Sequence, residues 1–176
     1  MPTYVRVILV PAHLNLYERG TLREVYGLDD SEYHPDILDD YRTNDGELSL
    51  FEFDLQQQSV ELIVCALAAQ STNCVARGYF LIDDGFFSAL GFPAPQKKNG
   101  GNTASPTIDE THYNIQLGTT QRRLELAHAI VDKCVPETIT TDEMEKYLVD
   151  YYHEGELPYM HKSLKKKLGL DLDEGE

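Results

Sequence analysis

Three successive segments indicate the fold class: LSLFEFD (48–54), SVELIVCALAAQ (59–70) and ARGYFLID (76–83). The first alternates apolar and polar residues and predicts a half-buried strand, with a β-bulge at Leu50–Phe51, where the alternation breaks. In the second, Ser59 suits an N-cap, and the following residues predict a helix that is apolar almost all round and therefore buried. A strand is the alternative for this run, because it is short and β-branched. The third segment predicts another strand.

The same patterns predict further elements on both sides of this stretch. On the N-terminal side they are a buried strand over 3–11, a short helix over 21–27 and a weak helix after Pro35. On the C-terminal side they are a weaker strand over 111–117 and three helices, which begin at Thr119 or Thr120, at Thr140 and at Pro158. Thr140 and Glu143 have the spacing of a capping box.

The predicted order of elements indicates one domain of α/β or α+β class over residues 1–170. We expect a mixed sheet of about four strands covered by helices, with a run of three helices at the C-terminal end. Residues 92–109 are rich in proline and glycine without hydrophobic periodicity, and they predict a long flexible loop. Residues 171–176 predict an acidic tail.

Acidic residues exceed basic ones along the whole chain, and the formal net charge is −15. Residues 1–58 hold 12 acids and 4 bases, residues 59–110 hold 5 and 3, and residues 111–176 hold 13 and 8. Such a field repels nucleic acid and anionic membranes and attracts cationic partners. The simpler alternative is that the charge only keeps the protein soluble.

The three cysteines, Cys65, Cys74 and Cys134, are far apart and odd in number, which favours reduced thiols in a cytosol-like compartment. No secretory signal is visible, and the longest uncharged run is too short to span a bilayer. We therefore expect a cytoplasmic protein that does not enter a membrane.

The first candidate site is an acidic segment between residues 29 and 40. Its six carboxylates are Asp29, Asp30, Glu32, Asp36, Asp39 and Asp40. They predict a surface that binds a basic protein, and the alternative is a solvated polar loop. An EF-hand aligned on Gly46 is excluded, because Tyr41 would then take the position of the first Asp ligand.

The second candidate site lies where predicted strands end. If the first three strands were parallel, their carboxyl ends would gather at one edge of the sheet, where ligands bind in open α/β folds. Those ends carry His13, Asp54, Asp83 and Asp84. Such a group could hold Mg²⁺ or Mn²⁺ and activate a water for hydrolysis. The alternative is that Asp83 and Asp84 simply open a turn.

Other polar and aromatic groups predict structural roles. No two histidines have metal-ligand spacing on one element, and the short basic pairs do not favour nucleic-acid binding in so acidic a chain. The tyrosines and methionines between 144 and 160 predict a helical core, with an interface patch as the alternative.

Signatures of several large enzyme classes, such as GxSxG, GxxxxGK[ST], HExxH and CxxC, are absent. The sequence therefore favours an acidic interaction protein without a cofactor, which docks on a basic protein, for example a nucleic-acid-binding one. An inhibitor, an immunity-type protein and a nucleic-acid mimic belong to this class. The alternative is a small metal-assisted hydrolase that uses the strand-end group with Mg²⁺ or Mn²⁺.

Overall fold

The computed structural model describes residues 2–8, 46–54 and 58–170. Across these residues one open sheet has the strand order β4-β5-β2-β1-β3-β6, and all neighbouring strands are antiparallel. The strands are β1 (Thr3–Val7), β2 (Glu47–Phe53), β3 (Arg77–Asp83), β4 (Gln96–Lys97), β5 (His112–Gln116) and β6 (Glu137–Ile139). The protein is therefore α+β. The expected sheet of about four strands is wrong in number, because β4 and β6 are too short to show a period. The expected mixed strand direction is also wrong, since every neighbouring pair is antiparallel.

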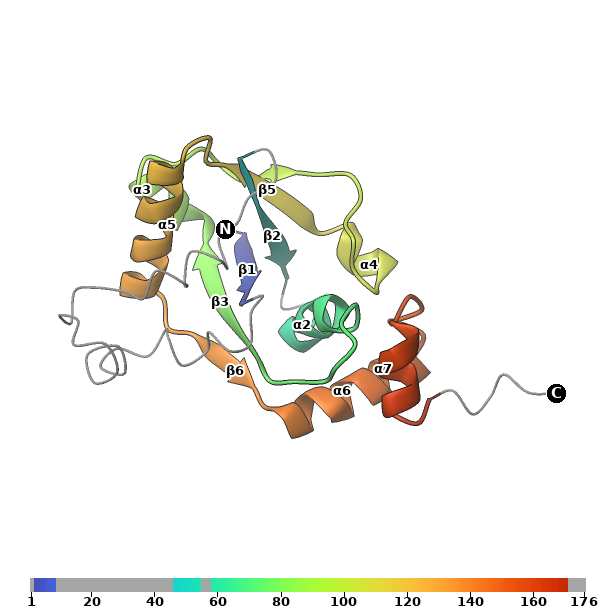
Figure 1. Ribbon diagram of the computed structural model, residues 1–176. Helices are drawn as coiled ribbons and strands as arrows, with labels where there is room; N and C mark the ends of the chain where they lie inside the picture. Colours follow the sequence, from blue (N-terminus) through green and yellow to red (C-terminus); the bar gives the residue numbers. More distant parts are fainter. Residues whose placement is uncertain (1, 9–45, 55–57, 171–176) are drawn as a thin grey trace, which may run out of the picture.

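Helices cover both faces of this sheet. The described residues form α2 (Val60–Ala68), α3 (Asp84–Ala89), α4 (Pro106–Asp109), α5 (Thr120–Lys133), α6 (Thr141–His153) and α7 (Lys162–Lys167). Helices α3 and α5 lie on one face, and α2, α4, α6 and α7 lie on the other (Figure 1). The expected run of three C-terminal helices is present as α5, α6 and α7, but β6 separates the first from the second.

The two covered faces explain the break in alternation that suggested a bulge in β2. Leu50 is buried in the cluster beneath α3 and α5, while Phe51 is buried in the cluster beneath α2 and α6. The pairing of β2 with β5 runs through both positions without an inserted residue, and the pairing with β1 includes Phe51. The predicted bulge is therefore wrong, because consecutive apolar residues are normal in a strand that is buried on both sides.

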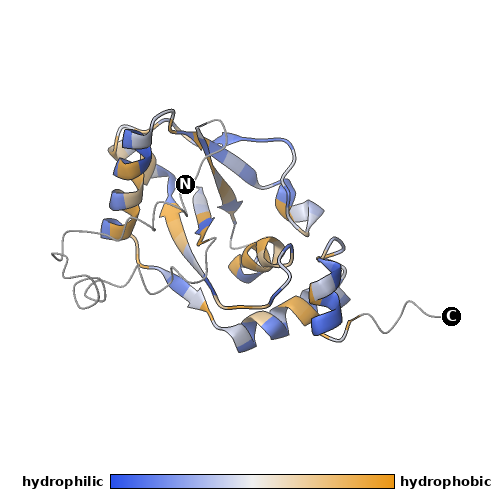
Figure 2. Cartoon of the chain, viewed as in Figure 1, coloured by the Kyte–Doolittle hydropathy of each residue, from blue (hydrophilic) through white to orange (hydrophobic). Residues whose placement is uncertain are grey.

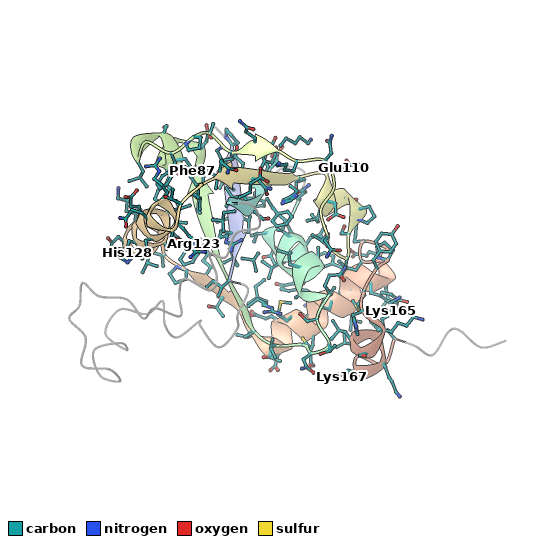
Figure 3. The ribbon with its side chains drawn as sticks, turned by 45° about the horizontal axis from the view of Figure 1, so that its top comes forward. Phe87, Glu110, Arg123, His128, Lys165 and Lys167 are labelled. Atoms are coloured by element: carbon teal, nitrogen blue, oxygen red, sulfur yellow. The ribbon has the colours of Figure 1, made fainter. Side chains whose placement is uncertain are left out.

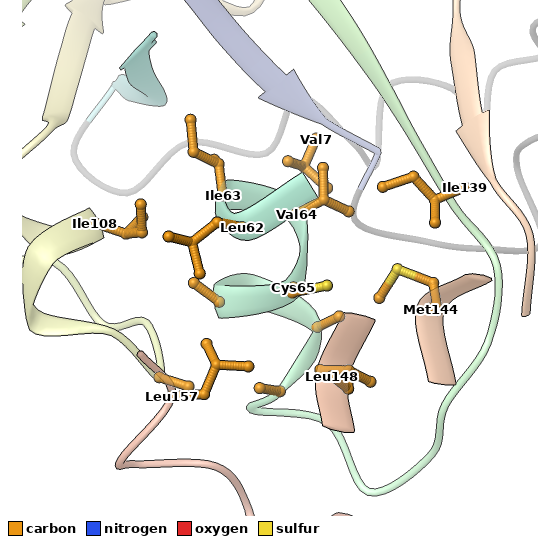
Figure 4. Close-up of a cluster of buried hydrophobic side chains, with 14 of the residues drawn as sticks. Val7, Leu62, Ile63, Val64, Cys65, Ile108, Ile139, Met144, Leu148 and Leu157 are labelled. Atoms are coloured by element: carbon orange, nitrogen blue, oxygen red, sulfur yellow. The ribbon is translucent and has the colours of Figure 1, made fainter. Parts of the chain in front are cut away.

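Helix α2 forms the centre of the larger core. The prediction of a buried helix is confirmed and the strand alternative is excluded, and Figure 2 shows α2 almost entirely in the hydrophobic colour. The Ser59 hydroxyl accepts a hydrogen bond from the Leu62 N–H at 3.1 Å, as an N-cap does. Ile63, Val64 and Cys65 are fully buried beside residues from β1, β6 and α6 (Figure 4).

The segment 92–109, expected to be a loop, contains β4 and α4 and is attached to the core through backbone groups. Ala104 donates its N–H to the Ala66 carbonyl at 2.9 Å, and its own carbonyl accepts from the Tyr159 N–H at 3.2 Å. Ala104 and Ile108 are fully buried. The hydrophobic pattern missed this attachment because most of it is made by main-chain atoms, which carry no sequence signal.

Helix ends follow the predicted caps in two of the three C-terminal helices. Thr119 caps α5, and Thr140 with Glu143 forms a complete capping box on α6. The third helix begins at Lys162 and not at Pro158, with His161 as its N-cap. The expected helices over 21–27 and after Pro35, the end of the first strand and the acidic tail lie outside the described residues.

Candidate interaction surface

Strand direction determines which of the predicted strand-end residues come together. Strands β2 and β3 flank β1, and both run antiparallel to it. Thr3, at the start of β1, is therefore opposite Phe53 on one side and opposite Asp83 on the other. Asp54, Asp83 and Asp84 consequently lie at one end of the sheet, although the parallel strands that predicted this are absent.

The carboxyl end of β1 does not lie at that edge of the sheet. Strand β1 runs in the opposite direction, so its carboxyl end at Val7 is at the other end of the sheet. His13 lies outside the described residues. The prediction that the carboxyl ends of the first three strands meet at one edge is wrong, because it required parallel strands.

The strand-end carboxylates are spread along the edge and do not converge. The backbones of β2 and β3 are separated by two inter-strand spacings, about 10 Å in total. Asp54 and Asp83 are exposed, and the Thr3 hydroxyl donates to Oδ1 of Asp83 at 3.3 Å. Within the described ranges, no group of three or more His, Cys, Asp or Glu side chains could hold a metal ion.

One further acidic residue, Glu52, borders the same end on the face covered by α3 and α5. Burial, together with the charges of Asp84 and Glu52, raises the pKa of Tyr4 to about 12. Burial and a hydrogen bond with Glu52 also raise the pKa of Tyr113. We call Glu52, Asp54, Asp83 and Asp84 the acidic sheet end. The acidic sheet end is a negatively charged rim, and the hydroxyls of Tyr4 and Tyr113 beside it stay protonated at neutral pH.

A groove of about 700 Å³ lies beside the acidic sheet end, between β3 and the chain that links α5 to β6. It is lined by Leu81, Asp83, Gly85, Phe86, Lys133, Cys134, Val135 and Glu137, and we call it the β3 groove. Leu81 is 38% exposed and Val135 81% exposed. Burial, with a contribution from the Asp83 charge, raises the pKa of Cys134. Its thiol is therefore not an activated nucleophile.

A second groove, of about 420 Å³, lies at the opposite edge of the sheet beside β4. Its lining includes Lys97, Lys98, Asp109 and Glu110, so both signs of charge are present. The Lys98 ammonium is 2.8 Å from a carboxylate oxygen of Glu47. This edge therefore carries paired charges, which do not form an anion site.

The cations of α7 lie away from the face of the sheet that α3 and α5 cover. Lys165 and Lys167 lie on α7, on the opposite side of the molecule from α5, which carries His128 (Figure 3). The Lys165 ammonium is 4.8 Å from the centre of the Tyr152 ring. Tyr152 packs against the core, as do Tyr147 and Tyr151, so the core prediction is confirmed for these three tyrosines. It is wrong for Tyr159, which is 64% exposed.

The acidic segment predicted as the partner-binding surface lies outside the described residues. Its members are Asp29, Asp30, Glu32, Asp36, Asp39 and Asp40. Sequence analysis missed the β3 groove, because alternation in 76–83 places Leu81 on a core face.

Comparison with known protein families, with curated proteins and with solved structures gives no match for this chain. In the described part of the chain, no helix has both the length and the apolar character needed to cross a bilayer. The features of this chain that bear on its function are therefore the acidic sheet end, the β3 groove and the net charge.

Proposed function

We propose that this protein is a non-enzymatic interaction protein whose acidic surface docks on a basic protein. An inhibitor, an immunity-type protein or a nucleic-acid mimic acts in this way. The observation that supports the proposal best is the distribution of the strand-end carboxylates. A docking surface needs charges spread over an exposed rim, as in the acidic sheet end, whereas a catalytic site needs a few that converge in a pocket.

The proposed contact surface has two parts. The first is the acidic segment at residues 29–40, and the second is the acidic sheet end. Residues 9–45 as a whole contain nine acids and three bases, so this part of the chain adds strongly to the field. Complementary charge accelerates the encounter with a basic partner and makes binding depend on salt.

The first experiment identifies the partner. The tagged full chain is used to capture proteins from host lysate at low and high salt, with and without nuclease. We expect one stoichiometric basic protein that is retained after nuclease treatment and released by high salt. Binding of one Mg²⁺ or Mn²⁺ per chain, lost in Asp83→Asn, would instead favour the hydrolase.

The second experiment locates the contact with three triple variants of equal charge change. They are Asp29→Asn/Asp36→Asn/Asp39→Asn in the segment, Glu52→Gln/Asp54→Asn/Asp83→Asn in the acidic sheet end, and Glu145→Gln/Asp150→Asn/Glu154→Gln along α6 and at its C-cap as the control. We expect the first two to weaken partner binding roughly 10- to 100-fold in low salt. The control removes three exposed charges from another surface and should change affinity little. Unchanged affinity in both test variants contradicts the proposed contact surface.

A further inference from the structure

The hydrogen-bond pattern of β3 leaves part of its outer edge available. Ile8 donates its N–H to the Gly78 carbonyl at 2.8 Å, and Asp84 donates to the Pro2 carbonyl at 3.1 Å. Even-numbered residues of β3 therefore pair with β1, and odd-numbered residues direct their N–H and C=O groups to the other side. On that side Tyr79 pairs with Glu137 of β6, and among the described residues the pairing ends there.

The strand continues beyond the end of this pairing. Leu81 and Asp83 belong to β3 and follow Tyr79 at the positions whose backbone faces outward. The register of β6 would place Val135 opposite Leu81, but the pairing ends at Glu137 and the chain leads away to α5. The β3 groove lies where β3 and the segment that precedes β6 separate. The Leu81 N–H and C=O and the Asp83 N–H border it.

Apolar side chains are exposed beside these backbone groups. The large hydrophobic side chains exposed in the described part of the molecule are Leu81, Val135 and Tyr159, and two of the three line the β3 groove. Phe86 and Cys134 extend the apolar lining, and the charges there are two carboxylates, Asp83 and Glu137, and one ammonium, Lys133. Proteins usually shield an exposed sheet edge with charge or proline on the strand itself. At Leu81 this edge is apolar, and none of the described residues pairs with it there.

We propose that the β3 groove binds an extended segment of the basic partner, which pairs with β3 at Leu81 and Asp83 as an added strand. This inference rests on the proposed function and specifies how that partner is held. An apolar side chain of the segment packs between Leu81 and Val135, and flanking Lys or Arg side chains face Asp83 and the acidic sheet end. Main-chain pairing supplies affinity and the alternate side chains supply specificity.

Charge favours a foreign basic segment over a second copy of this chain. Each copy has a formal net charge of −15, so edge-to-edge pairing of two copies brings like charges together. A basic segment gains from the same field. The backbone groups at the edge favour an extended conformation of the segment, because only a strand presents N–H and C=O groups along one line.

The test uses the full-length protein and two synthetic peptides. The first is an acetylated and amidated octapeptide of alternating lysine and valine. The second has the same sequence with N-methylated valines, so it keeps its charges and side chains but loses alternate N–H groups. We expect the first peptide to bind at least tenfold more tightly, to shift the backbone amide resonances of Leu81 and Asp83, and to slow their hydrogen exchange.

Neutral substitutions then test the side-chain contacts. Leu81→Gln and Val135→Gln should each weaken binding of the first peptide several-fold. Tyr159→Gln replaces the third exposed hydrophobic, which is 64% exposed and does not line the β3 groove, and it should leave binding unchanged. The folded state of each variant is verified from its amide spectrum before binding is measured.

Three outcomes overturn this inference. Equal binding of both peptides means that charge alone attracts them, which leaves the proposed acidic docking intact but removes strand pairing. Absence of binding, or binding without changes at Leu81 and Asp83, removes the β3 groove as the site. Concentration-dependent dimerisation without peptide, with the same amides protected, assigns the edge to a second copy. Failure of the acidic triple variants with the captured partner is a separate result and concerns the proposed function.

Discussion

The two edges of the sheet differ in how they are protected. The β4 edge is two residues long, is preceded by Pro93 and Pro95, and carries Lys97 and Lys98. The opposite edge begins as β6, but this strand covers only part of β3 and leaves exposed Leu81 facing Val135. Short length, proline and lysine are the features that keep sheet edges from pairing with other chains. The difference indicates that one edge is closed to association and the other is suited to it.

The largest expected effect tests how β6 is held against β3. Ile139 is buried in the core cluster near Met144 and Val7 (Figure 4). Ile139→Ala should lower the free energy of unfolding by about 2–4 kcal/mol, since it removes buried methyl groups and leaves a cavity. Urea denaturation followed by circular dichroism measures the change. Thr138→Ala, on the exposed neighbour, should change it by at most about 0.5 kcal/mol. Equal effects would show that Ile139 does not anchor this edge.

A smaller loss is expected at the cap that joins β6 to α6. The Thr140 hydroxyl accepts from the Glu143 N–H, and the Glu143 carboxylate accepts from the Thr140 N–H at 2.9 Å. Thr140→Ala should lower the free energy of unfolding by about 1 kcal/mol. Thr140→Ser keeps the hydroxyl and should retain most of the stability. If the two variants are equally unstable in urea, the hydroxyl is not the stabilising group.

A comparable or smaller effect is expected from the side-chain link between β3 and β6. The Tyr79 hydroxyl donates to Oε2 of Glu137 at 2.6 Å. Tyr79→Phe should lower the free energy of unfolding by about 0.5–1 kcal/mol, the typical net contribution of one hydrogen bond. Tyr159→Phe, at an exposed position, is the control and should have no measurable effect.

This link should also depend on pH at alkaline values. Burial and the hydrogen bond with Glu137 raise the pKa of Tyr79 above its ordinary value. Its contribution to stability is therefore complete below the ordinary tyrosine pKa and falls as pH rises above it. The difference in stability between the wild-type chain and Tyr79→Phe should narrow over that range. A stability difference that stays constant as pH rises would contradict the raised pKa of Tyr79.

The smallest expected effect concerns the β4 edge, where Lys98 contacts Glu47. A hydrogen bond with Lys98, and then one with Asn114, lowers the pKa of Glu47. This interaction stabilises the fold above the ordinary carboxyl pKa, and the contribution is lost as pH falls through the lowered value. Lys98→Ala should raise the pKa of Glu47 toward its ordinary value, as measured by NMR titration of the carboxyl carbon. Lys97→Ala should leave the pKa of Glu47 unchanged. Equal pKa shifts in the two variants would mean that the loss of any nearby positive charge has the same effect as the loss of the Lys98 hydrogen bond.

The elements that sequence analysis predicted well are those with a long or local signal. The buried helix α2 has nine residues of apolar character, and the capping box of α6 depends on four consecutive residues. Both signals are contained within the element itself. The short strands β4 and β6 have no such signal, because two or three residues do not establish a period.

The candidate surface was predictable only in part. Asp54, Asp83 and Asp84 follow or end strands, and this much is visible in the sequence. Their position at one end of the sheet results from β1 lying antiparallel between β2 and β3, which is a long-range pairing. The β3 groove was not predictable, because it depends on where the pairing of β6 with β3 stops.

The sequence by itself determined the acidic character of the chain, the mixed helix and strand content, and the helices whose caps and apolar patterns are local. Tertiary structure alone decided the direction and order of the strands, the burial of both Leu50 and Phe51, and the exposure of Leu81 at an unpaired edge. The physical reason is that side-chain periodicity reports which residues avoid water. It carries no information on which distant strand supplies the hydrogen bonds, and that pairing determines which edges remain open.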